Sequence, residues 1–112
     1  GEFGRTGGEL TINKGRDHNR LAQTALFAGA GVQGGRAFGV TDEQGAKVVK
    51  TEWNNKNRAI YTEDIFATVY SLLGIDWTKQ IVTTPSGRAF EYLEPVSSTD
   101  FIDISQIETL FT

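Results

Sequence analysis

Hydrophobic residues are sparse and irregular over the first twenty positions, which are rich in glycine and in charged side chains. This pattern predicts an extended loop, and loops of this length usually carry a function. From Thr24 to Val32 the residues are almost all apolar or small, and glycines cluster in residues 29–35. We expect a core strand buried on both faces that ends in tight glycine turns.

A hairpin is predicted next. Residues 36–41 alternate weakly, residues 42–45 form a turn signal, and residues 46–50 offer a short return strand. Residues 53–59 are polar around one tryptophan and predict a surface loop.

The clearest helix is expected over residues 63–73. Thr62 offers a side-chain oxygen for the N-cap, and Glu63 and Asp64 place negative charge in the first turn. Gly74 then supplies a C-terminal stop. The apolar side chains recur at three- and four-residue steps and predict one broad face that packs against a sheet or another helix: Ile65, Phe66, Val69, Tyr70, Leu72 and Leu73.

The last part of the chain predicts a second hairpin and a short helix or turn. Residues 80–83 and 89–93 are candidate strands on either side of a turn at residues 85–87. Apolar residues at helical spacing over residues 101–111 predict the terminal helix or turn.

These elements indicate an α/β fold in one domain or domain fragment. With 112 residues and 38% hydrophobic residues, the chain is long enough to build a core. The predicted order is a site loop (1–20), a core strand and hairpin (21–50), a helix (62–74), and terminal strands with a short helix (80–112).

Composition narrows the classes of partner. Eleven Lys and Arg against fourteen Asp and Glu give a net charge of −3, so no positive field attracts nucleic acid. No apolar stretch approaches the roughly 20 residues of a membrane span, so no membrane partner is expected. The absence of cysteine excludes disulfides and thiolate zinc sites, and the absence of methionine indicates a fragment or a processed product.

The candidate chemistry centres on His18, the single histidine. Without cysteine, its imidazole is the only neutral side-chain donor suited to a transition metal, and charged residues flank it on a glycine-rich segment. The alternative is a polar loop histidine bonded to the backbone. For Arg16 and Asp17, the alternative is a surface ion pair of little energetic value.

Five blocks resemble the last third of the uncharacterised sulfatase-like bacterial proteins of the alkaline phosphatase superfamily. The blocks occur in the same order over residues 2 to about 90, and together they make the similarity specific. They are Glu2-Phe3-Gly4-Arg5-Thr6, Gly15-Arg16-Asp17-His18-Asn19, residues 28–35, residues 39–42 and residues 64–76.

This resemblance implies the C-terminal portion of an α/β sandwich with a mostly parallel central sheet. It further implies a hydrolase of phosphate or sulfate esters that uses divalent metal, either zinc or manganese, calcium or magnesium. Under it, His18, Glu2 and Asp17 are candidate metal ligands, with Asp17 alternatively orienting the imidazole, and Arg5 and Arg16 would hold the anionic ester substrate. The resemblance alone suggests a periplasmic or secreted protein.

Two departures separate the chain from this pattern. Phe3 stands where the superfamily has a histidine, and the nucleophile belongs to a part of the architecture that the chain lacks. We therefore expect no catalysis by this chain alone, and a non-catalytic structural or binding module is the alternative. The Gly-Glu-Phe start is also typical of a cloning junction, in which case Glu2 has no role.

Three further expectations follow. The glycines of residues 29–35 lack the spacing of a phosphate-binding loop, so turns and close packing explain them better. The aromatic residues Trp53, Trp77 and Tyr61 are better explained as partial core than as a sugar-stacking surface. Exposed strand edges predict a homo-oligomer or an association with the missing N-terminal portion.

Overall fold

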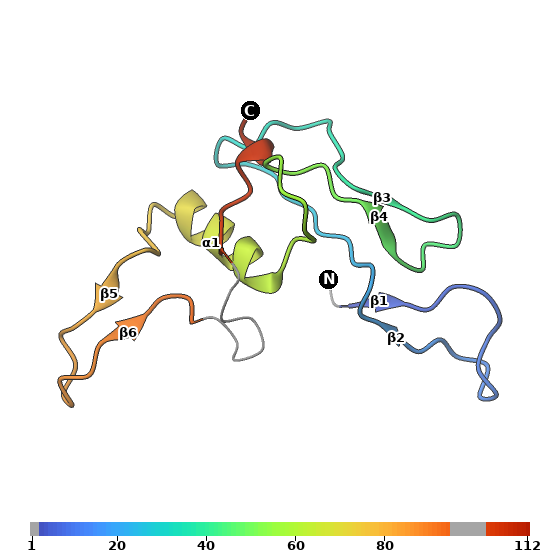
Figure 1. Ribbon diagram of the computed structural model, residues 1–112, viewed down its shortest axis with the longest axis horizontal. Helices are drawn as coiled ribbons and strands as arrows, with labels where there is room; N and C mark the ends of the chain where they lie inside the picture. The colour runs from blue at the N-terminus through green and yellow to red at the C-terminus, as the bar shows by residue number, and fades with distance from the viewer. Residues whose placement is uncertain (1–2, 95–102) are drawn as a thin grey trace. The chain divides into compact units, whose positions relative to one another are not determined.

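The computed structural model describes residues 3–94 and 103–112, and this part of the chain is a mixed fold (Figure 1). It has one α-helix and three small antiparallel sheets, each made of two strands that follow one another in sequence. A mostly parallel central sheet is not formed by these residues. The elements are β1 (Gly4–Arg5), β2 (His18–Asn19), β3 (Val40–Thr41), β4 (Val48–Lys50), α1 (Thr62–Leu72), β5 (Gln80–Ile81), β6 (Phe90–Glu91) and the 3-10 helix η2 (Glu108–Leu110).

The chain divides into two compact units, Gly1–Ala59 and Ile60–Thr112. The first holds β1 to β4, and the second holds α1, β5, β6 and η2. Within the described residues, no helix combines the length and the apolar character needed to cross a bilayer.

The glycine-rich start of the chain closes on itself through β1 and β2. Gly4 lies opposite Asn19, and Arg5 lies opposite His18. Gly4 has to be glycine, because a Cβ atom there would lie 2.0 Å from the backbone oxygen of Ala22. The predicted loop is therefore the long connection of a hairpin, which fixes the position of His18.

Asn19 ties this first hairpin to the second. Its side chain is buried, and its Nδ2 donates to the backbone oxygen of Ala46 over 2.8 Å. Its Oδ1 accepts the N–H of Leu21 at 2.9 Å, and the Leu21 carbonyl accepts the N–H of Val48 at 3.1 Å. The strand that carries His18 is thus held against β4.

The hairpin of β3 and β4 lies where the alternation and the turn signal place it. Asp42 organises the turn, since its Oδ1 accepts the N–H of Ala46 at 2.7 Å and its carbonyl accepts the N–H of Gly45 at 3.0 Å. The register shifts between Val40 and Thr41, as a β-bulge does.

The expected core strand at residues 24–32 is wrong. The segment forms no strand, and Leu26 is 94% exposed. Gly29, Ala30 and Gly31 all have positive φ, and the N–H of Val32 bonds to Gly29, so the predicted glycine turn is present. An apolar run becomes a buried strand only beside partner strands, and the described part of the chain supplies none to this segment.

The polar loop of residues 53–59 lies where it was predicted, and Trp53 is buried within it, as expected for a residue of the core. Trp53 is only 1% exposed, and its Nε1 donates to the carbonyl of Arg58 over 2.8 Å. The Arg58 guanidinium lies 4.9 Å from the centroid of the Trp53 ring. The loop therefore folds around its tryptophan.

In the second unit, α1 begins one residue earlier than the sequence predicts. Tyr61 is the N-cap, and Thr62 is already helical. Asp64 reaches back so that its Oδ2 accepts the N–H of Tyr61 at 2.8 Å. At the other end Gly74, with φ 73°, donates to Ser71 over 3.0 Å, which is the expected glycine stop.

The most buried residues of α1 lie outside its predicted apolar face, of which Ile65, Val69, Tyr70 and Leu72 are half-buried. The buried helix residues are Asp64, Ala67 and Thr68, whereas Phe66 is exposed and Leu73 is 68% exposed. Partly exposed apolar residues of this kind are what the predicted homo-oligomer or association with the missing N-terminal portion would cover, and this association stays a prediction.

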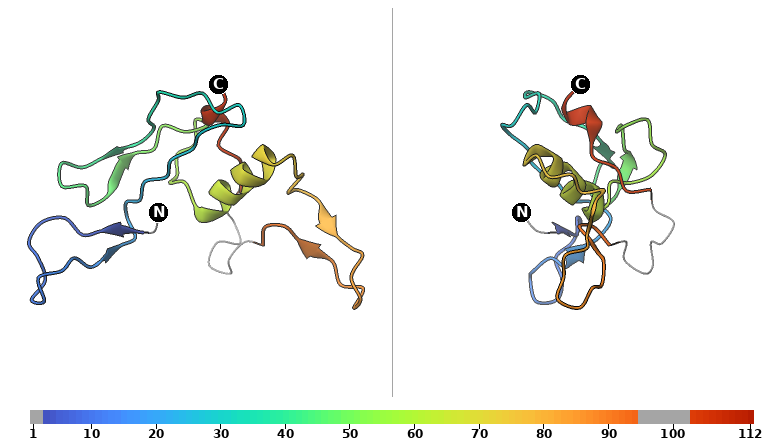
Figure 2. Two further views of the ribbon diagram at one scale, coloured as in Figure 1. Left: turned by 180° about the vertical axis from the view of Figure 1, so that it is seen from behind. Right: turned by 90° about the vertical axis from the view of Figure 1, so that its left-hand side faces the viewer.

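The expected second hairpin is present as β5 and β6, with Gln80 opposite Glu91 and Ile81 opposite Phe90. Both views of Figure 2 show it extending from the helix-bearing part of the second unit. The expected terminal helix is reduced to η2, and its first residues, 101 and 102, lie outside the described residues.

Candidate functional site

His18 is presented to solvent by the alternation of β2. Neighbouring side chains of a strand point to opposite faces, and here Asn19 is buried while His18 is exposed. Because Asn19 is held by Ala46 and Leu21, the imidazole sits on a fixed backbone. A side chain on such a support can be pre-organised for binding.

One face of the imidazole is covered by Phe3. The two ring centroids lie 3.8 Å apart, with 36° between the ring planes. The guanidinium carbon of Arg5 lies 5.2 Å from the centroid of the same phenyl ring. Phe3 therefore lies close to both the imidazole and the guanidinium group.

Both candidate arginines bond to backbone oxygens of the hairpin loop. Arg5 Nη1 donates to the carbonyl of Arg16 over 3.2 Å. Arg16 Nη1 donates to the carbonyls of Thr6 and Gly8, over 2.8 and 3.0 Å. These bonds orient each guanidinium group, whose five N–H donors form the planar fork that suits oxyanions.

Asp17 is joined to the hairpin by its backbone. Its N–H donates to Thr6 Oγ1 over 3.2 Å, and its carbonyl accepts the N–H of Thr6 at 3.0 Å. These bonds extend the pairing of β1 and β2 by one residue, where side chains alternate between faces. The contact found at the imidazole ring is Phe3, whereas the Asp17 side chain is solvent-exposed.

Two of the candidate metal ligands, His18 and Asp17, belong to this hairpin. In residues 3–94 and 103–112, no three histidine, aspartate or glutamate side chains are grouped closely enough to hold a metal ion. Glu2, the third candidate ligand, lies outside the described residues. An imidazole nitrogen and a carboxylate oxygen are donor types that suit zinc or a similar dication, but His18 and Asp17 are fewer than the three or four protein ligands that such a site uses.

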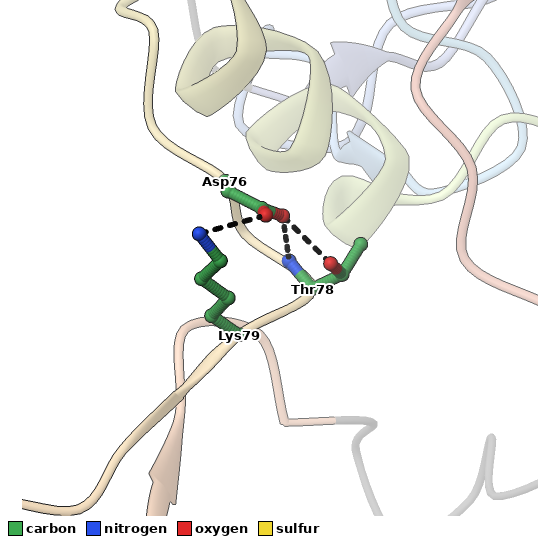
Figure 3. Close-up of polar contacts among 3 residues, drawn as sticks. All are labelled: Asp76, Thr78 and Lys79. Atoms are coloured by element: carbon green, nitrogen blue, oxygen red, sulfur yellow. Dashed lines mark hydrogen bonds and ion pairs between the residues drawn. The ribbon is translucent and has the colours of Figure 1, made fainter.

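Carboxyl groups with a lowered pKa are found outside the hairpin of β1 and β2, at Asp76 and Glu52. Figure 3 shows Asp76 after α1, where its Oδ1 accepts the Thr78 hydroxyl at 2.6 Å and the Thr78 N–H at 3.2 Å. These bonds, together with Lys79 at 3.4 Å, lower the pKa of Asp76. A hydrogen bond and ion pair with Lys50 likewise lower the pKa of Glu52. Both carboxylates are solvent-exposed, and the partners that lower their pKa values are residues close to them in the sequence.

A family model described as "Protein of unknown function (DUF1501)" matches residues 1–100. The chain belongs to the DUF1501 family. No curated protein and no protein of solved structure matches it. The matched range contains the hairpin of β1 and β2 as well as α1, so the arrangement of His18, Arg5 and Arg16 lies within the DUF1501 region.

Reasoning from the sequence missed two supporting residues of this DUF1501 hairpin. Asn19 is the buried anchor of the histidine strand, and Thr6 bonds to Asp17 with both its N–H and its hydroxyl. The signal for Asn19 is its position next to an exposed histidine, because a strand that exposes one residue turns the next one inward.

Proposed function

We propose that this DUF1501 chain is the C-terminal portion of a metal-dependent hydrolase of phosphate or sulfate esters, and that it is not catalytic alone. The observation that carries this proposal is the pairing of Arg5 with His18 across β1 and β2. Arg16 is bonded to the loop of the same hairpin. An imidazole, which is a common metal ligand, and two guanidinium groups thus belong to one hairpin.

The roles follow from the chemistry of these side chains. His18 would supply a nitrogen ligand, and a divalent metal would lower the pKa of a bound water or alkoxide and polarise the ester. Arg5 and Arg16 would hold the anionic oxygens through paired N–H donors. Asp17 would complete the ligand set or orient the imidazole.

The similarity of the five sequence blocks to sulfatase-like proteins of the alkaline phosphatase superfamily supports this assignment. Under the proposal, the nucleophile and the remaining carboxylate ligands come from sequence upstream of Gly1 in a longer protein. The substrate class is an anionic ester.

Metal titration tests the role of His18. Calorimetry with zinc and with manganese should show binding to the wild-type chain and its loss in His18→Ala. Arg20→Ala is the matched control, since Arg20 is an exposed residue just beyond β2. Equal metal binding by the wild type and His18→Ala would remove the ligand role. An ester-hydrolysis assay on the longer protein, with and without His18→Ala, tests the hydrolase activity.

The second candidate is a non-catalytic structural or binding module. It is favoured by the Phe3 ring on the imidazole, because Phe3 stands where the superfamily has histidine. If His18 serves only to pack against Phe3, then Phe3→Ala and His18→Ala should both lower the melting temperature, and added metal should change neither. Metal-dependent stabilisation of Phe3→Ala would contradict the module.

A further inference from the structure

The two strands of the first hairpin, β1 and β2, divide their side chains between two faces. Directly opposite residues of an antiparallel pair share a face, and residues two positions apart in one strand return to it. Arg5 therefore shares a face with its cross-strand partner His18. The same rule extends this face along both strands, and we call it the histidine face: Phe3, Arg5, Gly7, Arg16, His18 and Arg20.

Contacts and exposure agree with this division. The ring centroids of Phe3 and His18 lie 3.8 Å apart, and the guanidinium carbon of Arg5 lies 5.2 Å from the centroid of the Phe3 ring. Asn19 belongs to the opposite face and is only 8% exposed, whereas every residue of the histidine face is exposed. The histidine face is therefore the solvent side of the hairpin.

The charged residues of the histidine face all have the same sign. Arg5, Arg16 and Arg20 lie on it, and none of its residues is an aspartate or a glutamate. Asp17 takes the alternate register position, on the face of Asn19. In an extended chain, the distance from Arg16 to Arg20 is about 13 Å along the strand. This row of guanidinium donors is therefore longer than one phosphate or sulfate group.

The three arginines fall at two ends of this row. Arg5 Nη1 donates to the Arg16 carbonyl over 3.2 Å, and Arg16 Nη1 donates to carbonyls of the hairpin loop, so both belong to the loop end. Arg20 occupies the register position opposite Phe3, at the end away from the loop. Phe3 is 38% exposed and supplies apolar surface beside the row. A single anion held by Arg5 and Arg16 thus leaves Arg20 unused.

We infer that Arg20 binds a second anionic group, and that the histidine face accepts esters with at least two phosphate or sulfate groups. One group bonds to Arg5 and Arg16, the other bonds to Arg20, and the Phe3 ring packs against the body of the molecule. The sign of the charge selects an anion, and the length of the row selects more than one anionic group. This inference rests on the anion-binding role proposed for Arg5 and Arg16, and it requires no metal at His18.

Calorimetric titration of the full chain in metal-free buffer tests this inference with orthophosphate and with tripolyphosphate, which has several linked anionic groups. Tripolyphosphate should bind at least about tenfold more tightly, because its further groups add intramolecular contacts. Arg20→Ala should lower the affinity for tripolyphosphate by about fivefold, as expected for the loss of one exposed ion pair, and leave the affinity for orthophosphate unchanged. The matched control, Arg36→Ala, should change neither affinity.

Arg36 suits this control because it is also exposed, belongs to the same unit and lies 5.1 Å from the centroid of a phenyl ring, that of Phe38. Its loss changes the net charge equally, so a general attraction of polyanions would weaken equally in both variants. Equal losses in the two variants, or no effect of Arg20→Ala on tripolyphosphate, would overturn the inference, while orthophosphate binding would still support Arg5 and Arg16. If the wild type binds neither anion, the anion-binding role of Arg5 and Arg16 fails as well.

Discussion

The backbone N–H of Ser105 donates a 2.9 Å hydrogen bond to the carboxylate of Asp64, which lies forty-one residues earlier in the chain. The other oxygen of the same carboxylate accepts the N–H of Tyr61 at the start of α1. One buried side chain therefore both caps the helix and fixes the C-terminal segment on it.

Asp64→Ala should destabilise the second unit strongly. The change removes the acceptor of two N–H groups, and each unsatisfied group costs about 1–3 kcal/mol, so we expect a loss of about 2–6 kcal/mol. Urea unfolding followed by circular dichroism measures this loss. Glu63→Ala is the matched control, since Glu63 is the neighbouring acidic residue of the first turn and should cost about 0.3–1 kcal/mol. Equal losses for the two variants would contradict the dual role of Asp64.

Gly4→Ala should distort the hairpin that carries His18. The added Cβ would lie 2.0 Å from the Ala22 oxygen, so the backbone must shift, at a cost of about 1–3 kcal/mol. Gly15→Ala in the same hairpin is the control, because a Cβ there meets only the Thr11 hydroxyl, at 3.8 Å. Thermal melting should separate the two variants. A Gly4→Ala protein as stable as Gly15→Ala would show that β1 does not approach Ala22.

The turn after α1 should respond to pH through Asp76. Hydrogen bonds from Thr78 and the charge of Lys79 lower the pKa of this carboxyl in the folded chain. A lowered folded-state pKa gives stability that is present above the unfolded pKa and is lost as the pH falls through the folded pKa. Asp76→Asn should therefore lower the melting temperature slightly at neutral pH, and the difference should vanish in acid.

Carbon-detected NMR titration of Asp76 tests the cause of this shift. Thr78→Val should raise the pKa more than Lys79→Ala does, because the Thr78 hydroxyl is the largest contribution. The reverse order would assign the shift to the lysine.

The elements that the sequence predicts well are those with local signals. The helix has acidic residues in its first turn and Gly74 at its end, and the hairpin of β3 and β4 has Asp42 to organise its turn. Each of these signals acts within a few residues, so one stretch of sequence is enough to read it.

The elements that it predicts poorly depend on distant partners. Residues 24–32 have the composition of a buried strand, but no neighbouring strand pairs with them in the described part of the chain. Asp64 and Thr68 are buried where Ser105 and Ile107 donate hydrogen bonds to them. The periodicity of the helix carries no information about these distant residues. At the candidate site, the chemistry of His18 is visible in the sequence, whereas its contact with Phe3 requires the register of β1 and β2.

Arg16 gives the last prediction, which separates its structural role from its proposed substrate role. Its Nη1 bonds to the carbonyls of Thr6 and Gly8, so Arg16→Ala should loosen the loop between β1 and β2 and speed amide hydrogen exchange over residues 6–16. Because the side chain is exposed, global stability should fall by only about 0.5–1.5 kcal/mol.

Arg16→Lys then distinguishes the two roles. Lysine keeps the charge and loses the planar fork, so it should restore part of the loop protection but not bidentate anion binding. Sulfate titration followed by NMR should show weaker binding by both Arg16 variants and unchanged binding by Arg20→Ala. If Arg16→Lys binds sulfate as the wild type does while its loop stays loose, Arg16 holds the hairpin together and is not the anion ligand.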